Sequence, residues 1–436
     1  MQKDMSNYFK HCYKVNSRYY CFRGELIVKY LLYLMIFASP MSATVYVLET
    51  SFGRISLFRS ILLITILLTV ALYASKGKRI KLYCKKNRLS IMFMTIWLLY
   101  ALVSFFWAKD YSDWMRYTFF LIVGVITMLL FNNYLNDLKS IIGAFQALTW
   151  GITVQACIGW YEVISGNYLF GFAEGIYNIK MSLKIPVAMC GGSNEFATLM
   201  FLGVFTAYAC YSWCQIKLVK KLYLFMLVND LVLLIVTKSR SAMIGFLLSF
   251  ILLLFIGDKR KKIFFSLLSM IVLTMPPVIE FLSANIHFNF ELGSDSYRLA
   301  LLKNGFLMLL NSFGIGVGAG QAEYWLKRGM VYKTGGVTVL HNWWMEILAS
   351  YGIFIFAGYL LFYYKLFMSC FRDYKYSHNG KIKAIGVSIC AIMFGYVIVG
   401  IGASSNMTNE WLWIFWGVCI AYQGVSNKSE KIASNL

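Results

Sequence analysis

Residues 57–74 read LFRSILLITILLTVALYA, and residues 247–256 read LLSFILLLFI. Both stretches are apolar on nearly every face, so neither leaves the polar stripe that a surface helix of a soluble protein needs. A membrane barrel would instead show segments of alternating hydrophobicity, which these runs lack. Because only helices and closed barrels satisfy their backbone groups in lipid, the two stretches predict membrane-spanning helices.

The composition extends this prediction to the whole chain. Of 436 residues, 59% are hydrophobic and 14% are charged, which is too little polar surface to cover a soluble globule of this size. Apolar runs of roughly 20 residues, enough to cross a bilayer, recur along the chain and predict about twelve spans. The predicted spans are residues 25–46, 57–75, 90–107, 117–132, 141–164, 195–215, 219–236, 241–257, 263–283, 343–369, 383–403 and 410–425.

The loops between these spans alternate in their content of Lys and Arg, which indicates the orientation. One set is rich in positive charge: the arm before residue 24, residues 76–88, 217–221, 258–262 and 372–383. The other set is poorer: residues 165–194, 237–241, 284–342 and 404–409. We therefore expect a multi-pass membrane protein with both termini in the cytoplasm and the second set of loops outside.

The same alternation accounts for the net charge of +22 without a nucleic-acid partner. The ten cysteines form no CxxC pair and show no Cys/His spacing typical of a metal site. Internal repeats and low-complexity linkers are not apparent. We therefore treat residues 1–436 as a single polytopic membrane domain with no expected metal or cofactor.

The outward loop at residues 284–342 is the largest and contains its own helix signals. Ser294 or Asp295 is a suitable N-cap for a helix that runs to about Leu310 and ends at Asn311 and Gly314. A glycine-rich segment, residues 314–320, follows it and precedes a second amphipathic stretch at residues 321–328. The glycines lack the strand, the following helix and the Lys-Ser/Thr pair of a nucleotide-binding loop.

Three cations in outward segments are candidates for binding an anion. Lys238 and Arg240 lie in Thr237-Lys238-Ser239-Arg240-Ser241, a short polar turn between two spans, and Arg298 lies early in the loop helix. A guanidinium group matches phosphate oxygens and stays charged at any pH. The alternative is structural: Lys238 and Arg240 reach lipid head groups, and Arg298 belongs to a solvated helix face.

His341 is the histidine expected at an outward helix start, whereas His11 and His378 fall on the cytoplasmic side. A neutral imidazole there can accept a proton from a hydroxyl or orient it. Asn342 follows it, and Glu346 lies one turn into the span, where a carboxylate is rare and can orient a site. Asn194 begins another span at the outward surface. A capping role is the alternative for His341 and for Asn194.

Four ordered segments resemble the O-antigen ligase and O-antigen polymerase superfamily. They are Ser239-Arg240-Ser241-Ala242, Tyr297-Arg298, Gly314-Ile315-Gly316-Val317-Gly318 and His341-Asn342. The resemblance implies an all-α integral membrane fold of the GT-C type in a bacterial cytoplasmic (inner) membrane, with part of the active site on the large loop. It also implies an inverting, metal-independent glycosyltransferase whose donor is a glycan on undecaprenyl pyrophosphate. Arg240 and Arg298 would neutralise the leaving pyrophosphate, and His341 would activate an acceptor sugar hydroxyl, with Asp295 and Glu323 as alternative bases.

Residues 318–325 and 341–346 look most like the secreted-polysaccharide and teichuronic-acid branch, which favours a polymerase of surface-polysaccharide repeat units. A ligase that transfers finished polysaccharide to lipid A core or another carrier is the alternative within the superfamily. A lipid-linked oligosaccharide flippase is the alternative from another class. Expected partners are the lipid-linked donor, the glycan acceptor and the bilayer, together with a chain-length regulator and a flippase.

Overall fold

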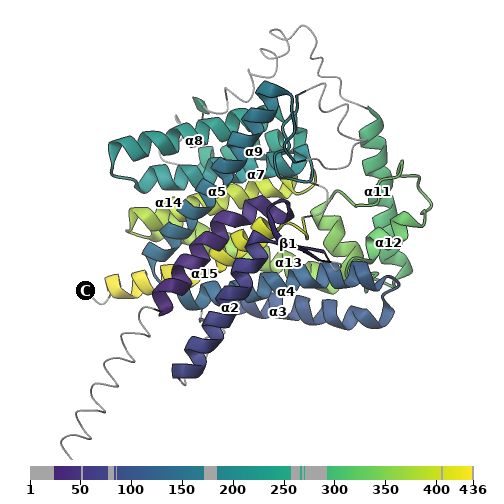
Figure 1. Ribbon diagram of the computed structural model, residues 1–436, viewed down its shortest axis with the longest axis horizontal. Helices are drawn as coiled ribbons and strands as arrows, with labels where there is room; N and C mark the ends of the chain where they lie inside the picture. Colours follow the sequence, from purple (N-terminus) through teal and green to yellow (C-terminus); the bar gives the residue numbers. More distant parts are fainter. Residues whose placement is uncertain are drawn as a thin grey trace, which may run out of the picture.

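The computed structural model describes residues 24–50, 53–76, 83–84, 86–170, 184–256, 266–267, 270, 292–403 and 406–434. Long helices dominate this part of the chain (Figure 1). After a first apolar segment, Gly24–Met41, the helices are α2 Leu57–Lys76, α3 Arg88–Val103, α4 Tyr111–Tyr134, α5 Leu138–Ser165, α7 Ser193–Trp213, α8 Lys217–Val236, α9 Arg240–Ile256, α11 Leu292–Asn311, α12 Gln321–Lys327, α13 Trp343–Tyr376, α14 Gly380–Val399 and α15 Glu410–Ser434. Two 3-10 helices, η1 Ser39–Thr44 and η2 Ser104–Trp107, complete the helical elements.

The predicted spans agree with these helices. Every predicted span coincides with a helix except residues 263–283, which lie almost wholly outside the described residues. Within the described part, 8 helices are long and apolar enough to cross a membrane. That set omits α8, α9 and α15, so the number of spans stays a prediction, while the helical membrane fold is established.

A small antiparallel hairpin lies between the first apolar segment and α2. Its strands are β1 Tyr46–Thr50 and β2 Gly53–Ser56, with Tyr46 opposite Ser56 and Thr50 opposite Gly53. The hydropathy pattern did not predict it, because strands this short in a connecting loop leave no apolar run to detect. The hairpin leads directly into α2, whose first residue, Leu57, donates its backbone N–H to Val45.

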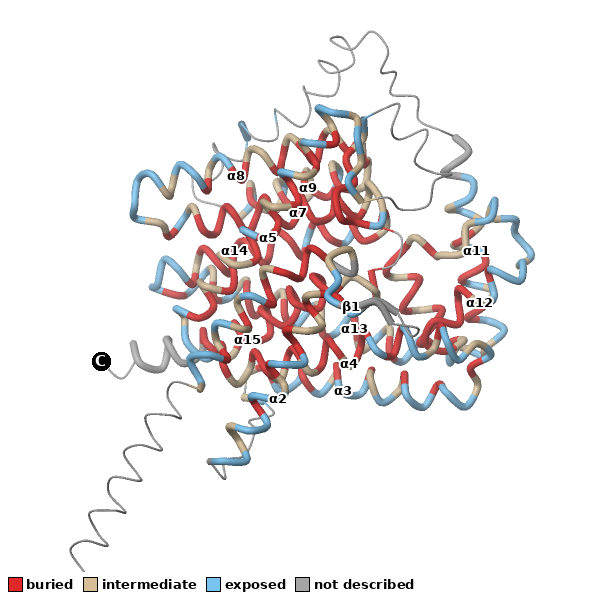
Figure 2. The backbone as a smooth tube through the Cα atoms, in the orientation of Figure 1, coloured by how far each residue is buried: buried red, intermediate tan, exposed pale blue. Residues whose placement is uncertain are grey.

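The helices pack around α7, which is the most enclosed of the candidate spans. Its apolar window is 89% buried within the protein, whereas that of α2 is 28% buried and is left to face lipid. α7 contacts α5, α8 and α14, while α15 packs on α4 and α13 packs on α14. Figure 2 shows the buried residues in the middle of the bundle and the exposed residues around it.

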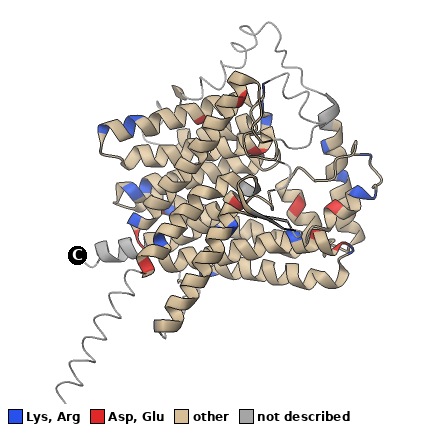
Figure 3. Ribbon diagram, in the orientation of Figure 1, with Lys and Arg blue, Asp and Glu red and all other residues tan. Residues whose placement is uncertain are grey.

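Contacts between helix ends agree with the predicted division of the loops into two sides. On one side, Lys86 pairs with Asp373 at 2.9 Å, and the Tyr374 hydroxyl donates to the Ile256 carbonyl at 2.8 Å. On the other side, Arg59 pairs with Glu410 at 2.7 Å. Figure 3 shows the charged residues gathered toward the ends of the helices, with an uncharged band between them. Which of the two sides faces the cytoplasm stays a prediction.

Small residues bring α9 and α14 into close contact. A Cβ at Gly395 would lie 2.4 Å from the Gly245 carbonyl oxygen and 2.2 Å from the Ser249 hydroxyl, so only glycine fits this crossing. Ser249 also donates to the Ala391 carbonyl across the interface at 2.7 Å. Small residues and interhelical hydrogen bonds are the usual basis of helix association in membranes. The crossing holds the start of α9 beside the end of α14.

The glycine-rich segment docks into a break in α13. Gly352 has φ 78° and ψ −179°, which interrupts the helix inside the membrane-spanning run. Val317 and Gly318 donate backbone N–H groups to the carbonyls of Ala349 and Ser350, both at 2.9 Å, and Ile353 donates to Gly314 at 2.9 Å. The backbone groups freed by the break are therefore satisfied by the loop, as non-helical backbone at this depth requires.

The loop helices are largely as predicted. α11 ends at Asn311 and α12 covers Gln321–Lys327, in agreement with the sequence. The predicted N-cap of α11 is wrong, because the helix begins at Leu292, ahead of both Ser294 and Asp295. The side chain of Asp295, an alternative base, lies outside the described part of the chain.

Candidate functional site

His341 occupies the turn immediately before α13. The Asn342 side chain caps this helix by accepting from the backbone N–H groups of Trp344 at 3.0 Å and Met345 at 3.1 Å. His341 is half-buried and has φ 49°, a left-handed conformation that is uncommon for a residue other than glycine. Trp343, two residues after His341, donates its backbone N–H to the Gly400 carbonyl at 2.9 Å. Asn342 therefore acts as a cap that fixes where the histidine sits.

The turn between α8 and α9 carries Lys238 and Arg240. Lys238 has φ 56°, and Arg240 is half-buried as the first residue of α9. The hydroxyls of Ser239 and Ser241 lie 3.3 Å apart. A Cβ at Gly402 would lie 1.9 Å from the Ser241 hydroxyl, so this turn packs directly on the end of α14.

The residues Gly400–Gly402 at the end of α14 therefore join two of the predicted site segments. Gly400 accepts the backbone N–H of Trp343, two residues after His341, and Gly402 packs against Ser241, the neighbour of Arg240. The two segments are about a hundred residues apart in sequence, yet each touches the same short turn of the chain. The structure thus brings the neighbourhoods of Arg240 and His341 to one end of the bundle.

Arg298 lies on α11, another part of which packs on the start of α13. A Cβ at Gly305 would lie 2.6 Å from the Met345 side chain and 3.5 Å from Leu340, so this face of α11 packs on the start of α13. Arg298 is seven residues earlier, nearly two helical turns, and therefore lies on the same face, roughly 10 Å along the axis. It is half-buried.

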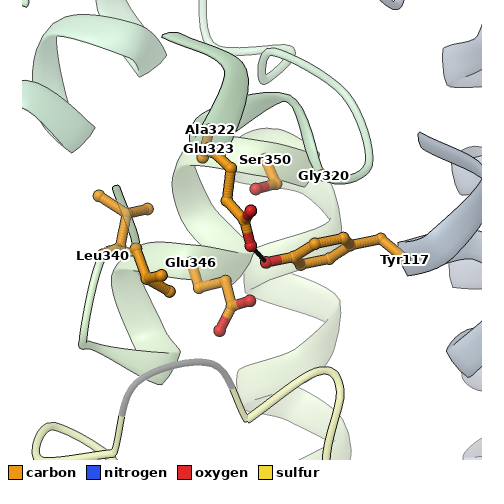
Figure 4. Close-up of a pocket in the computed structure, with 8 residues that line it drawn as sticks. Tyr117, Gly320, Ala322, Glu323, Leu340, Glu346 and Ser350 are labelled. Atoms are coloured by element: carbon orange, nitrogen blue, oxygen red, sulfur yellow. Dashed lines mark hydrogen bonds between the residues drawn. The ribbon is translucent and has the colours of Figure 1, made fainter. Parts of the chain in front are cut away.

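Glu346 is buried in the first turn of α13 and lines a small pocket with Tyr117, Gly320, Glu323, Leu340 and Ser350. Figure 4 shows Glu346 and Glu323 entering this space from α13 and α12, with Tyr117 reaching it from α4. The pocket has room for little more than one water molecule. The carboxylates of Glu346 and Glu323 therefore line one pocket together with Leu340, the residue before His341.

Glu323 is engaged by several partners. Arg116 contacts Glu323 at 2.6 Å and Asp113 at 3.1 Å, and Lys327 contacts Asp113 at 2.9 Å and Glu323 at 3.6 Å. The Tyr117 hydroxyl also donates to Glu323. The hydrogen bond to Asp113 raises the pKa of Lys327, against the effect of desolvation. These four charged residues, which we call the α4–α12 charge cluster, join the loop to α4 and leave Glu323 poorly available as a base.

Sequence reasoning missed Asp113, Arg116 and Tyr117. The signal was weak, because acidic and basic groups at the start of a span are ordinary N-terminal features, and Asp110 does cap α4 by accepting from Ser112 and Asp113. Only the fold shows that this first turn of α4 contacts α12.

The prediction that Asn194 caps a helix was wrong, because the N-cap of α7 is Gly192. Asn194 lies half-buried in the first turn, where its carbonyl accepts from Thr198 at 2.8 Å.

Among the described residues, no group of three or more His, Cys, Asp or Glu side chains is arranged to hold a metal ion. The cations of the candidate site come from two separate segments, the α8–α9 turn and α11. Such an arrangement is suited to binding an anion through guanidinium and ammonium groups.

Comparison with known proteins points to the same segments. Residues 223–360 match a protein family described as O-antigen ligase, a range that contains Lys238, Arg240, Arg298, His341 and Glu346. The chain is also 26% identical over 357 residues to the teichuronic acid biosynthesis protein TuaE of Bacillus subtilis (strain 168), covering 78% of this chain and 73% of that protein. These matches, together with the helical membrane fold, support the resemblance of the chain to the O-antigen ligase and O-antigen polymerase superfamily.

Proposed function

We propose that this protein is a membrane glycosyltransferase that polymerises repeat units of a surface polysaccharide. The polymerase or ligase role in surface-polysaccharide biosynthesis follows from the superfamily, and the similarity to a teichuronic acid biosynthesis protein favours the polymerase. The proposed donor is a glycan on undecaprenyl pyrophosphate, and the proposed acceptor is a sugar hydroxyl at the outer face of the cytoplasmic membrane. A flippase that supplies the donor and a chain-length regulator are the expected partners.

The observation that carries this proposal is the convergence at Gly400–Gly402. The turn bearing Lys238 and Arg240 and the helix start bearing His341 both pack on it, and the face of α11 that carries Arg298 packs on the same helix start. The segments that carry Arg240, Arg298 and His341 are far apart in sequence but pack on one another or on the same turn, which supports the proposal that they form one site. Such a combination fits transfer from a phosphorylated donor better than a purely structural role.

In the proposed reaction, the acceptor oxygen attacks the anomeric carbon as the bond from that carbon to the pyrophosphate oxygen breaks. His341 takes or orients the hydroxyl proton, and Arg240 and Arg298 stabilise the charge on the departing lipid pyrophosphate. Attack from the face opposite the leaving group inverts the anomeric centre. The leaving group is already a weak base, so neither a proton donor nor a metal is required.

Buried Glu346 would orient the acceptor side of this site from its place in the first turn of α13. Lys238 would add positive charge beside Arg240. Asn342 contributes by capping α13 and fixing His341, and Asn194 would border the site from α7.

The test follows lipid-linked single units and long polymer in vesicles that carry His341→Ala, Arg240→Ala or Arg298→Ala. Each is expected to lower transfer by about 10²–10³-fold, the cost of losing a catalytic base or one charge-stabilising donor. Single units should accumulate while long polymer disappears. His378→Ala and Arg372→Ala, which change the same residue types at the other end of the bundle, are the matched controls for folding and expression.

The alternatives give different results in the same assay. Accumulation of long lipid-linked chains in the three variants would identify a ligase that transfers finished polysaccharide to another carrier. Normal polymer in all three, at normal expression, would exclude the proposed site and leave a lipid-linked oligosaccharide flippase as the better explanation.

A further inference from the structure

A second and larger cavity lies against the glycine-rich segment, which contributes Gly316 and Val317 to its wall. It has a volume of about 330 Å³, within the range of small-ligand sites. Its wall combines four separate segments: the α3–α4 connection, the end of α11, the glycine-rich segment, and α12 with the residues that follow it. The lining residues are Trp107, Lys109, Met308, Asn311, Ser312, Gly316, Val317, Trp325 and Met330.

Two indole rings line the cavity from different elements. Trp107, at the end of η2, is held against the Tyr100 ring at a centroid distance of 5.9 Å in an edge-on arrangement. Trp325, on α12, is held edge-on to Tyr324 at 5.4 Å and is 37% exposed. Packing therefore fixes both rings, and rigid aromatic faces bind flat apolar surfaces at little entropic cost.

The polar groups of the cavity argue for a polar ligand. The indole N–H of Trp107 is buried, and no hydrogen-bond acceptor for it is found among the described residues. A buried donor left without an acceptor is costly, so a ligand that supplies an oxygen there is favoured. Lys109 and Asn311 are exposed at the cavity. An acyl chain would leave the Trp107 N–H without a hydrogen bond and would place no polar group beside Lys109 and Asn311.

A sugar ring meets both requirements, because its C–H face stacks on an indole and its hydroxyls accept and donate hydrogen bonds. We propose that this cavity is a saccharide subsite that holds a sugar of the glycan undergoing transfer, away from the bond that breaks. The subsite adjoins the proposed reaction centre, since Val317 in its wall donates to Ala349, within three residues of Glu346. This inference rests on the proposed glycosyltransferase function.

The test measures binding of oligosaccharide fragments, prepared from the host strain's own surface polysaccharide, to the full chain in lipid nanodiscs by saturation-transfer NMR. Trp325→Ala is expected to weaken binding about tenfold, as loss of one stacked ring would. Trp107→Phe keeps a ring but removes the N–H, and a severalfold loss is expected for one hydrogen bond. Trp150→Ala, which removes an exposed indole from α5, is the matched control and should bind normally.

Fragments that bind both tryptophan variants as tightly as the parent protein would overturn the subsite. A loss in Trp325→Ala with none in Trp107→Phe would support a sugar stacked on Trp325 and exclude the hydrogen bond from the Trp107 N–H. The His341→Ala variant separates the two proposals, because it should lose transfer yet bind fragments normally. If His341→Ala abolishes polymer but the tryptophan variants bind normally, only the subsite is wrong; if His341→Ala polymerises normally, the proposed function falls instead.

Discussion

Gly352 shows how strongly a single residue can be constrained in this fold. Its φ of 78° and ψ of −179° fall in a region that only glycine occupies readily. A Cβ there would lie 2.1 Å from the Ile315 carbonyl oxygen and 2.4 Å from that of Gly314. Because the obstructing atoms are backbone of the docked segment, a small side-chain adjustment cannot relieve the clash.

We therefore expect Gly352→Ala to destabilise the protein by about 3 kcal/mol or more, the cost of a forbidden backbone conformation together with lost docking contacts. The measurement is the thermal unfolding midpoint of detergent-purified protein, followed by size-exclusion chromatography after heating. Gly380→Ala is the matched control, because a Cβ at Gly380 meets nothing within 4 Å. Equal midpoints for the two variants would show that the glycine-rich segment does not depend on the break in α13.

Residue-level prediction from sequence succeeded where the chemistry is local and failed where it depends on a distant partner. Glu346 is buried at the helix start where the sequence placed it, because a capping Asn342 precedes it. The break at Gly352 could not be foreseen, since Tyr351-Gly352 lies in an apolar run like many others. Its cause is a segment some forty residues earlier that packs backbone against backbone.

At the scale of elements, the attachment of α12 to α4 depends on the α4–α12 charge cluster. The acidic members are nearly buried, with side-chain exposures of 9% for Asp113 and 11% for Glu323, while Arg116 and Lys327 are about half exposed at 46% and 48%. Loss of both cations would leave the neighbouring carboxylates of Asp113 and Glu323 without these positive charges to offset their repulsion. Because solvent screens the exposed cations, each ion pair contributes at most about 1 kcal/mol to the free energy that holds α12 on α4.

We expect the double variant Arg116→Gln with Lys327→Gln to loosen α12. Hydrogen exchange across Gln321–Lys327 should become about tenfold faster, which corresponds to roughly 1.4 kcal/mol. Salt should speed the exchange of the parent protein but have little effect on the variant. Arg328→Gln, which removes an exposed guanidinium near the Tyr324 ring, is the control. Unchanged exchange in the double variant would mean that packing alone holds α12.

Helix positions were predicted well because hydropathy runs are a local and strong signal in membrane proteins. Helix starts in the loops were predicted less well. The residues chosen as caps, Ser294 or Asp295 for α11 and Asn194 for α7, have the right chemistry, but α11 begins at Leu292 and α7 at Ser193, so these residues lie inside the helices. Several polar residues stand near each start, and sequence alone does not say which of them leaves the helical conformation.

At the scale of the whole molecule, contacts between helix ends divide the loops into two sides without a bilayer being present. The pairing of Lys86 with Asp373 joins two loops predicted to be cytoplasmic, and the pairing of Arg59 with Glu410 joins the first residues of two predicted spans, 57–75 and 410–425. The sequence could predict this division because charge bias acts on every loop separately. The convergence at Gly400–Gly402 could not be predicted, since it depends on how α9, α13 and α14 cross.

The predicted orientation of the chain in the membrane can be tested by labelling one position on each side. Val331, in the large loop, is 77% exposed, and Tyr376, at the end of α13, is 64% exposed, so a cysteine at either position is accessible from its own side. In protoplasts or spheroplasts, a membrane-impermeant maleimide should label Val331→Cys above the level of the parent chain. It should label Tyr376→Cys only after permeabilisation, because positively charged loops are retained in the cytoplasm. The reverse labelling pattern would show that the protein has the opposite orientation. His341 and Arg240 would then lie on the cytoplasmic side, and an outward-facing polymerase site would be excluded. Labelling of both positions in sealed cells would show that the assignment of α13 as a membrane-crossing helix is wrong.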